Sequence, residues 1–203
     1  MKNGLTEILC VIDKSGSMSS LVSDTIGGFN SFVEDQKKVA GEARVSLTLF
    51  DTDYNSLYMS TPIQQVAKLT ESQYCPSGMT ALLDAVGKTI AEAGAEFAKR
   101  PESERPEKVI MVIITDGEEN SSREYKKEAL KTLVEKQMKE WKWEFIYLGA
   151  NQDAFAEAGG LGISNVANFS CNSASIGNTY SGISRSVVSY RAGGAVSLDQ
   201  TSY

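Results

Sequence analysis

The sequence predicts an α/β fold, with a doubly wound, mostly parallel sheet of six strands, one antiparallel edge strand and helices on both faces. Three observations lead to this prediction. Apolar runs of strand length recur along the chain, and the strongest, residues 109–114, is typical of a central parallel strand. Segments with the apolar spacing of helices separate the runs. Two runs are joined only by Asp51-Thr52-Asp53, which predicts a hairpin.

The first half of the chain is expected to form three strands and two helices. The apolar run of residues 8–12 predicts a buried strand over residues 5–12. Residues 45–49 alternate apolar and polar side chains, as a half-buried strand does, and residues 54–61 predict the returning strand, which Pro62 ends. Amphipathic helices are expected at residues 21–39 and 81–98. Gly27 and Gly28 weaken the first of these by about 1 kcal/mol each relative to alanine.

The second half continues the alternation of strands and helices. Strands are expected at residues 109–114, 144–148 and 166–170, and helices at residues 124–139 and 153–158. Residues 64–75 and 100–106 are expected to be loops. A last helix carries an apolar stripe that we expect to face the core, because its members are spaced by four, three, four and three: Ile176, Tyr180, Ile183, Val187 and Tyr190.

Length and composition are those of one globular unit. At 203 residues the chain is long enough for a substantial core, and we expect a single domain over residues 1–203, with its core at about residues 5–192 and a frayed tail at residues 193–203. The excess of 26 acidic over 20 basic residues argues against nucleic acid or an anionic membrane as a partner. The amino terminus does not resemble a secretory signal, and a cytoplasmic location is expected. The oligomeric state is not predicted.

Cysteine and histidine usage excludes several kinds of site. Cys10, Cys75 and Cys171 are widely spaced and form no Cys-x-x-Cys pattern, so neither a disulfide framework nor a zinc site is expected. Histidine is absent. Its absence removes Ser-His-Asp catalysis, Cys-His catalysis and histidine-based metal sites.

An Asp-x-Ser-x-Ser motif follows the first predicted strand. Asp13, Ser15 and Ser17 come directly after the apolar run of residues 8–12, and ligand sites of open α/β sheets lie at the carboxyl ends of strands. All three side chains offer oxygen and none offers nitrogen or sulfur. Oxygen donors suit a hard cation such as Mg²⁺ and not zinc or copper.

Two further loops offer oxygen at strand or helix ends. Residues 78–84 form a glycine loop that presents Thr80 and then opens a predicted helix, and Asp116 follows the strand of residues 109–114. Taken singly, Ser15 and Ser17 are more simply caps of the following helix or its loop, and Asp116 is more simply part of an Asp-Gly turn. For Thr80, a first-turn helix residue is an equally good explanation. Taken together, the three loops predict that these side chains converge above the sheet.

With these residues the sequence resembles a von Willebrand factor type A domain. Asp13, Ser15 and Ser17 occupy the family's Asp-x-Ser-x-Ser motif, and Thr80 and Asp116 match the threonine and aspartate of its second and third loops. The order of elements fits over residues 5–192, and residues 147–155 resemble stand-alone bacterial or phage members.

The resemblance implies a metal-ion-dependent adhesion site that holds Mg²⁺ or Mn²⁺. Ser15, Ser17 and Thr80 would bind the metal through their hydroxyls, Thr80 either directly or through a water, while Asp13 and Asp116 would hold metal-bound waters and supply charge. One coordination position would stay open for an Asp or Glu of a partner protein.

Three functions are compatible with these residues. The leading hypothesis is a metal-dependent protein-binding module without catalysis of its own. The alternative is a Mg²⁺-dependent phosphate-handling hydrolase that uses the same strand-end site, but the sequence lacks a phosphate-binding glycine loop of either common type, an Asp-x-Asp pair and histidine. A purely structural subunit is the third hypothesis, and it leaves five suitably placed polar residues unexplained.

Overall fold

A computed structural model describes residues 1–150, 154–169 and 173–198, without the side chains of residues 173–176. It contains one six-stranded sheet with the strand order β3-β2-β1-β4-β5-β6. Only the β2–β3 pair is antiparallel. The predicted fold class is therefore confirmed, including the antiparallel strand at one edge. The strands are β1 (Lys2–Asp13), β2 (Glu42–Phe50), β3 (Tyr54–Pro62), β4 (Pro106–Thr115), β5 (Glu144–Gly149) and β6 (Asn165–Asn168).

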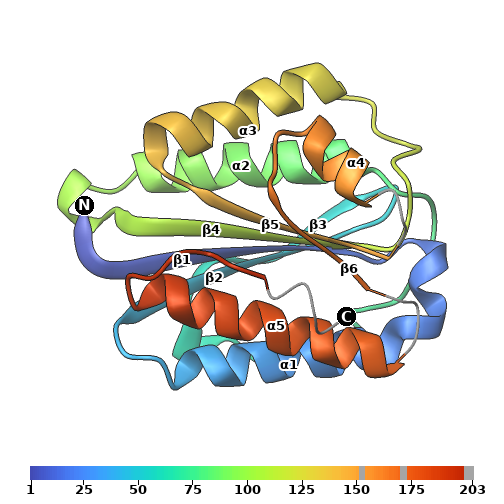
Figure 1. The fold of residues 1–203 in the computed structure, drawn as a ribbon, viewed down its shortest axis with the longest axis horizontal. Coiled ribbons are helices and arrows are strands. Elements are labelled where there is room, and N and C mark those ends of the chain that lie inside the picture. Colours follow the sequence, from blue (N-terminus) through green and yellow to red (C-terminus); the bar gives the residue numbers. More distant parts are fainter. Residues whose placement is uncertain (151–153, 170–172, 199–203) are drawn as a thin grey trace.

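Helices cover both faces of the sheet, as Figure 1 shows. Helices α1 and α5 lie on one face, and α2, α3 and α4 on the other. Each face of the sheet has a hydrophobic core, the first core between the sheet and helices α1 and α5, and the second between the sheet and helices α2, α3 and α4. Strand β1 contributes to both, because successive side chains of a strand point to opposite faces. Ile8 and Ile12 belong to the first core, and Leu9 and Val11 to the second. The helices are α1 (Val22–Lys37), α2 (Leu82–Ala98), α3 (Lys127–Trp141), α4 (Ala154–Gly160) and α5 (Ser173–Arg191).

Most predicted elements are present with shifted ends. The expected helix at residues 21–39 is α1, Val22–Lys37, and a 3-10 helix, Gly16–Leu21, precedes it. Helix α3 begins at Lys127 instead of residue 124. The reason is visible in the preceding segment, where the Asp84 carboxylate accepts hydrogen bonds from the backbone N–H groups of residues 123–125 and holds them outside the helix. The predicted helix and strand ends at residues 153 and 170 lie outside the described residues.

The last part of the described chain returns to the core. Of the predicted apolar stripe, Tyr180, Ile183 and Val187 are buried, and the side chain of Ile176 lies outside the described residues. Beyond α5, Val196 and Leu198 pack against the first core, in a segment expected to fray. The backbone N–H of Ser197 also donates to Ser186 Oγ at 3.1 Å.

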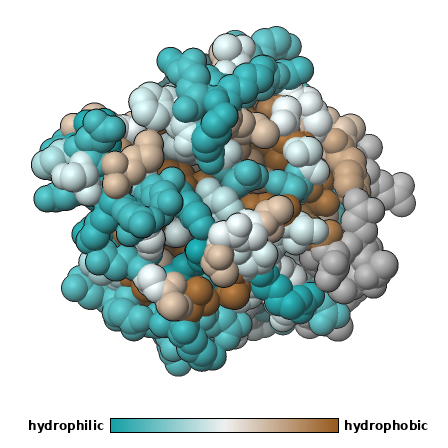
Figure 2. Space-filling model, turned by 60° about the vertical axis from the view of Figure 1, so that its left-hand side comes forward, coloured by the Kyte–Doolittle hydropathy of each residue, from teal (hydrophilic) through white to brown (hydrophobic). Residues whose placement is uncertain are grey.

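Hydrophobic surface is sparse on the side of the molecule that holds the N-terminus. Figure 2 brings this side forward, and its hydrophobic areas are small and separated by hydrophilic side chains. Four large hydrophobic residues of the described chain are exposed: Met1, Met79, Trp141 and Phe155. Within the described residues, no helix combines the length and the apolar character that crossing a membrane requires.

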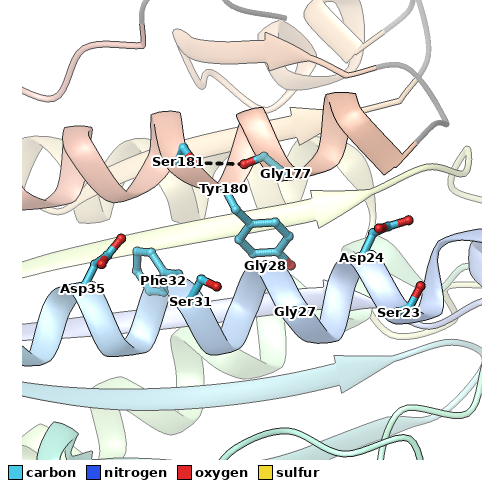
Figure 3. Close-up of a pocket in the computed structure, with 10 residues that line it drawn as sticks. All are labelled: Ser23, Asp24, Gly27, Gly28, Ser31, Phe32, Asp35, Gly177, Tyr180 and Ser181. Carbon is cyan, nitrogen blue, oxygen red and sulfur yellow. Dashed lines mark hydrogen bonds between the residues drawn. The ribbon is translucent and has the colours of Figure 1, made fainter.

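Helices α1 and α5 make close contact at a glycine. The ring of Tyr180 in α5 lies across α1 at Gly28 (Figure 3). A Cβ atom at Gly28 would stand 2.1 Å from Tyr180 Cδ2, whereas one at Gly27 would meet nothing within 4 Å. Gly28 is therefore required for this packing, and Gly27 is not. A groove of about 280 Å³ remains beside the contact.

A buried carboxyl group lies in the middle of the sheet. Glu7 in β1 is fully buried, and its Oε2 and Oε1 accept hydrogen bonds from Ser60 Oγ at 2.7 Å and Ser46 Oγ at 3.1 Å. Arg100 donates to Ser60 Oγ at 2.8 Å, and Arg44 to the Ser60 carbonyl at 3.0 Å. Burial outweighs these hydrogen bonds and the two nearby guanidinium groups, and it raises the pKa of Glu7 to about 7.

Gly28→Ala and Gly27→Ala form a matched pair that tests the helix contact. Gly28→Ala should lower the free energy of unfolding by about 2 kcal/mol, because the added methyl group forces Tyr180 out of its place. Gly27→Ala should leave it unchanged or raise it by up to about 1 kcal/mol, the helix preference of alanine. Urea unfolding measures both. Equal effects of the two substitutions would show that Tyr180 does not pack on Gly28.

Glu7→Gln tests the buried carboxyl group through the pH dependence of stability. The folded pKa lies above the unfolded value of 4.5, so the stabilisation from the bound proton is complete below the unfolded pKa and is lost as the pH rises through about 7. The shift corresponds to about 3 kcal/mol. The difference in free energy of unfolding, Glu7→Gln minus wild type, should therefore be larger at about pH 8 than at about pH 5.

The exposed Glu42 supplies the control for this comparison. Glu42→Gln should follow the wild-type pH profile in denaturant unfolding. Parallel profiles of wild type and Glu7→Gln between the two pH values would contradict a raised pKa at Glu7.

Candidate metal centre

The pairing of β1 with β4 brings two predicted site loops together. The two strands run in parallel with Ile12 opposite Ile114, so β1 ends at Asp13 beside the end of β4 at Thr115. Thr115 Oγ1 donates a hydrogen bond of 2.6 Å to Asp13 Oδ2. Asp116, the next residue, therefore enters its loop directly beside the motif that follows β1.

The motif itself turns its side chains toward that loop. The backbone N–H of Ser15 donates to Asp13 Oδ1 at 2.6 Å, which folds the loop back on the carboxylate. The hydroxyl oxygens of Ser15 and Ser17 are 3.0 Å apart, and Ser17 Oγ donates to Asp116 Oδ1 at 2.6 Å. Four of the five predicted residues are thus connected by direct contacts.

Thr80 lies on the other side of the same loop. Its side chain is buried, and a Cβ atom at Gly117 would lie 2.8 Å from Thr80 Oγ1 and 3.5 Å from Ser17 Oγ. The hydroxyls of Thr80 and Ser17 therefore border one small space beside Gly117. The structure brings all five predicted residues to this point at the carboxyl edge of the sheet.

Asp51 fastens the loop that carries Thr80. Its carboxylate forms an ion pair with Lys14 and accepts a 2.8 Å hydrogen bond from Ser77 Oγ. Its carbonyl accepts from the backbone N–H of Ala81 at 2.9 Å. Asp51 thus holds the loop on both sides of Thr80, in addition to forming the predicted hairpin turn, where its carboxylate accepts from the N–H of Asp53 at 2.7 Å.

The segment after Asp116 is bonded to the same loop and to the start of α2. Asn120 Oδ1 accepts from the Thr80 N–H at 2.9 Å, and the Asn120 N–H donates to the Thr80 carbonyl at 3.0 Å. Glu119 Oε2 accepts from the N–H of Leu83 at 2.9 Å. Glu119 and Asn120 therefore connect two of the site loops, although Asn120 is exposed.

Burial makes the two carboxyl groups of the site unfavourable as isolated anions. Asp13 is fully buried, and this burial raises its pKa to about 6. Hydrogen bonds from Thr115 and Ser15 lower the pKa in part, and the negative charge of Asp116 raises it further. Burial also raises the pKa of Asp116. Two neighbouring carboxylates with this penalty favour a cation or a proton between them.

The donor set fits a hard divalent cation. The five side chains offer three hydroxyl and four carboxylate oxygens and no nitrogen or sulfur, which is the chemistry that Mg²⁺ and Mn²⁺ accept. Among the residues that the structure describes, no three His, Cys, Asp or Glu side chains gather in a group able to hold a metal. A metal here would therefore depend on Ser15, Ser17 and Thr80.

Other residues considered from the sequence lie apart from this centre. Cys10 is a buried free thiol and Cys75 an exposed one, and Cys171 lies outside the described residues. Trp143 is buried and stacks on Phe145. Trp141 is half-exposed at the last position of α3.

Comparison with known proteins identifies the fold. No protein-family model matches the chain, and no curated protein matches its sequence. Solved structures do resemble it. A von Willebrand factor type A protein from Catenulispora acidiphila shares 12% identity with a TM-score of 0.60, over 91% of this chain and 43% of its own.

Two further solved structures give the same result. The manganese-loaded TRAP protein of Plasmodium vivax shares 18% identity with a TM-score of 0.58, over 78% of this chain and 64% of its own. Proximal thread matrix protein 1 from the mussel byssus shares 15% identity with a TM-score of 0.55, over 91% of this chain and 45% of its own.

The chain spans less than two thirds of each of these structures. The narrower resemblance to stand-alone bacterial or phage members stays a prediction. What the three structures share with this chain is the arrangement of strands and helices that carries the candidate metal centre, and the chain has the fold of von Willebrand factor type A domains.

Proposed function

We propose that this chain is a divalent-metal-dependent protein-binding module whose metal, Mg²⁺ or Mn²⁺, is held by Asp13, Ser15, Ser17, Thr80 and Asp116. The observation that carries the proposal is the line of direct contacts from Asp13 through the two serines to Asp116, with Thr80 across the small space beside Gly117. The manganese-loaded state of the Plasmodium vivax structure supports a metal in this fold.

The five residues of the site would have two different roles. The hydroxyls of Ser15, Ser17 and Thr80 would bind the cation, while Asp13 and Asp116 supply negative charge from buried positions. When bound, the metal supplies a Lewis-acidic position that accepts a carboxylate. A partner protein that presents Asp or Glu would therefore be selected over one that presents a neutral side chain.

The two carboxylates also explain why the metal is needed for an acidic partner. Without a cation, an incoming carboxylate would meet Asp13 and Asp116 and be repelled by charges of the same sign. A cation held by these residues would offset this repulsion and attract the incoming carboxylate. Partner binding should thus be lost on chelation. The fold should remain, because the two hydrophobic cores are formed by side chains other than those of the metal site.

No observation favours the alternative of a Mg²⁺-dependent hydrolase. Such enzymes draw on several carboxylates around their metal, and the site described above brings only Asp13 and Asp116 together. A cytoplasmic location, and the exclusion of nucleic acid and membrane as partners, stay predictions.

Ser17→Ala with Ser19→Ala as its control tests the metal site. Ser17 Oγ contacts both Ser15 Oγ and Asp116, whereas Ser19 Oγ donates to the Gly16 carbonyl on an exposed part of the same turn. Ser17→Ala should weaken Mn²⁺ binding by roughly tenfold or more, because even residues that only orient metal ligands contribute that much. Ser19→Ala should bind like wild type. Calorimetric titration measures both, and equal affinities would contradict the assignment.

Gly117→Ala tests the space between Ser17 and Thr80. The added methyl group would stand 2.8 Å from Thr80 Oγ1 and 3.5 Å from Ser17 Oγ. Mn²⁺ binding should weaken by roughly tenfold or more. Gly94→Ala on α2 is the control, because its methyl group meets nothing within 4 Å. A Gly117→Ala variant that unfolds like wild type and still binds Mn²⁺ with wild-type affinity would place the metal elsewhere.

A further inference from the structure

The residue directly before Thr80 is an exposed methionine. Met79 has half of its surface in contact with solvent, in a loop whose next residue is buried at the metal centre. Single exposed apolar side chains are common and need no function. Met79 differs from such a residue in two respects: the loop that carries it is rigid, and it lies directly before Thr80 of the candidate metal centre.

The backbone around Met79 is held from four sides. The Met79 N–H donates to Thr52 Oγ1 at 2.9 Å, and the Gly78 carbonyl accepts from the Gly16 N–H at 3.2 Å. The N–H groups of Thr80 and Ala81 are bonded to Asn120 and Asp51. Little ordering entropy is therefore lost in this loop when a partner binds, which favours affinity.

Gly78 sets the direction of the loop at this point. Its φ of +65° belongs to the left-handed region that side chains other than glycine rarely adopt, and a Cβ there would stand 2.7 Å from Thr52 Oγ1. The turn leaves the Thr80 side chain buried and the Met79 side chain in solvent. The loop thus presents an apolar side chain next to a metal ligand.

A second exposed apolar residue lies at the same edge of the sheet. Thr115 at the end of β4 pairs with Gly149 at the end of β5, and Gly149 packs against Ala154 at the start of α4. Phe155 follows and is half-exposed. The Met79 N–H is bonded to Thr52 in the turn between β2 and β3, whereas Phe155 follows β5, so the two lie on opposite sides of the β1 and β4 loops that carry Asp13 and Asp116.

We propose that Met79 determines partner specificity, and that the partner presents an acidic residue with a large apolar side chain one or two positions away. The inference rests on the proposed metal-dependent binding. Consecutive Cα atoms are about 3.8 Å apart, so a partner residue one or two positions from the acidic residue at the metal can reach Met79, the neighbour of Thr80. The thioether of methionine is adaptable, which suits Leu, Ile, Met or Phe equally.

A peptide library tests this inference with a defined probe. The library carries a fixed central Asp with random flanking residues, and it is selected on the full chain with Mn²⁺ and again with chelator. We expect Mn²⁺-dependent peptides to be enriched in large apolar residues within two positions of Asp. Met79→Gln should bind these peptides roughly tenfold more weakly, because the apolar contact is lost. Met79→Leu should restore their affinity.

Two controls separate Met79 from the metal and from general hydrophobicity. Mn²⁺ binding by Met79→Gln, measured by calorimetry, should equal that of wild type. Trp141→Gln removes an equally exposed apolar side chain from the end of α3, and it should leave the peptide preference unchanged.

The outcomes distinguish this inference from the proposed function. Mn²⁺-dependent peptides without an apolar preference, or with a preference that persists in Met79→Gln, would overturn the role of Met79 and leave the metal-dependent module standing. If no peptide depended on Mn²⁺, both proposals would fail together.

Discussion

The hydrogen bond from Thr115 to Asp13 marks the constraint on which the candidate centre depends. It exists because β1 and β4, which are far apart in the sequence, pair in parallel at the middle of the sheet. This pairing sets Asp13 and Asp116 side by side and aims the Ser15 and Ser17 hydroxyls into the gap between the two strand ends. The apolar residues that drive the pairing lie on both faces of β1, so the same strand supplies core packing and the first part of the site.

The sequence was sufficient to predict the fold class and the convergence of the five candidate residues, but not the contacts that hold their loops in place. The apolar runs determine which segments are buried strands, and the motif residues follow those strands directly. The supports at Asp51, Glu119 and Asn120 have no such local signal, because each acts on a loop that is distant in sequence. The closeness of Gly28 to Tyr180 was likewise inaccessible: the glycine pair was visible, and its partner ring 152 positions away was not.

Glu7 shows a different limit of sequence reasoning. It lies within the predicted first strand, where a glutamate would ordinarily be placed on an exposed position. The structure buries it because β2 and β3 bring Ser46 and Ser60 over its carboxyl group and the end of α2 brings Arg100 beside them. A buried carboxyl group without a direct ion pair is costly unless it holds its proton. Hydroxyl partners that can both donate and accept make that protonated state possible.

The candidate centre and the Glu7 cluster both contain buried carboxyl groups, but the groups around these carboxyls differ. Glu7 is surrounded by hydroxyls and guanidinium groups that offset only part of the cost of its burial, and its raised pKa favours the protonated form. Asp13 and Asp116 are buried next to each other, and the negative charge of Asp116 raises the pKa of Asp13 further. Nearby hydroxyls offset only part of this penalty. A cation between the two carboxyl groups would remove this penalty, and the geometry that sets them side by side is consistent with the proposed metal.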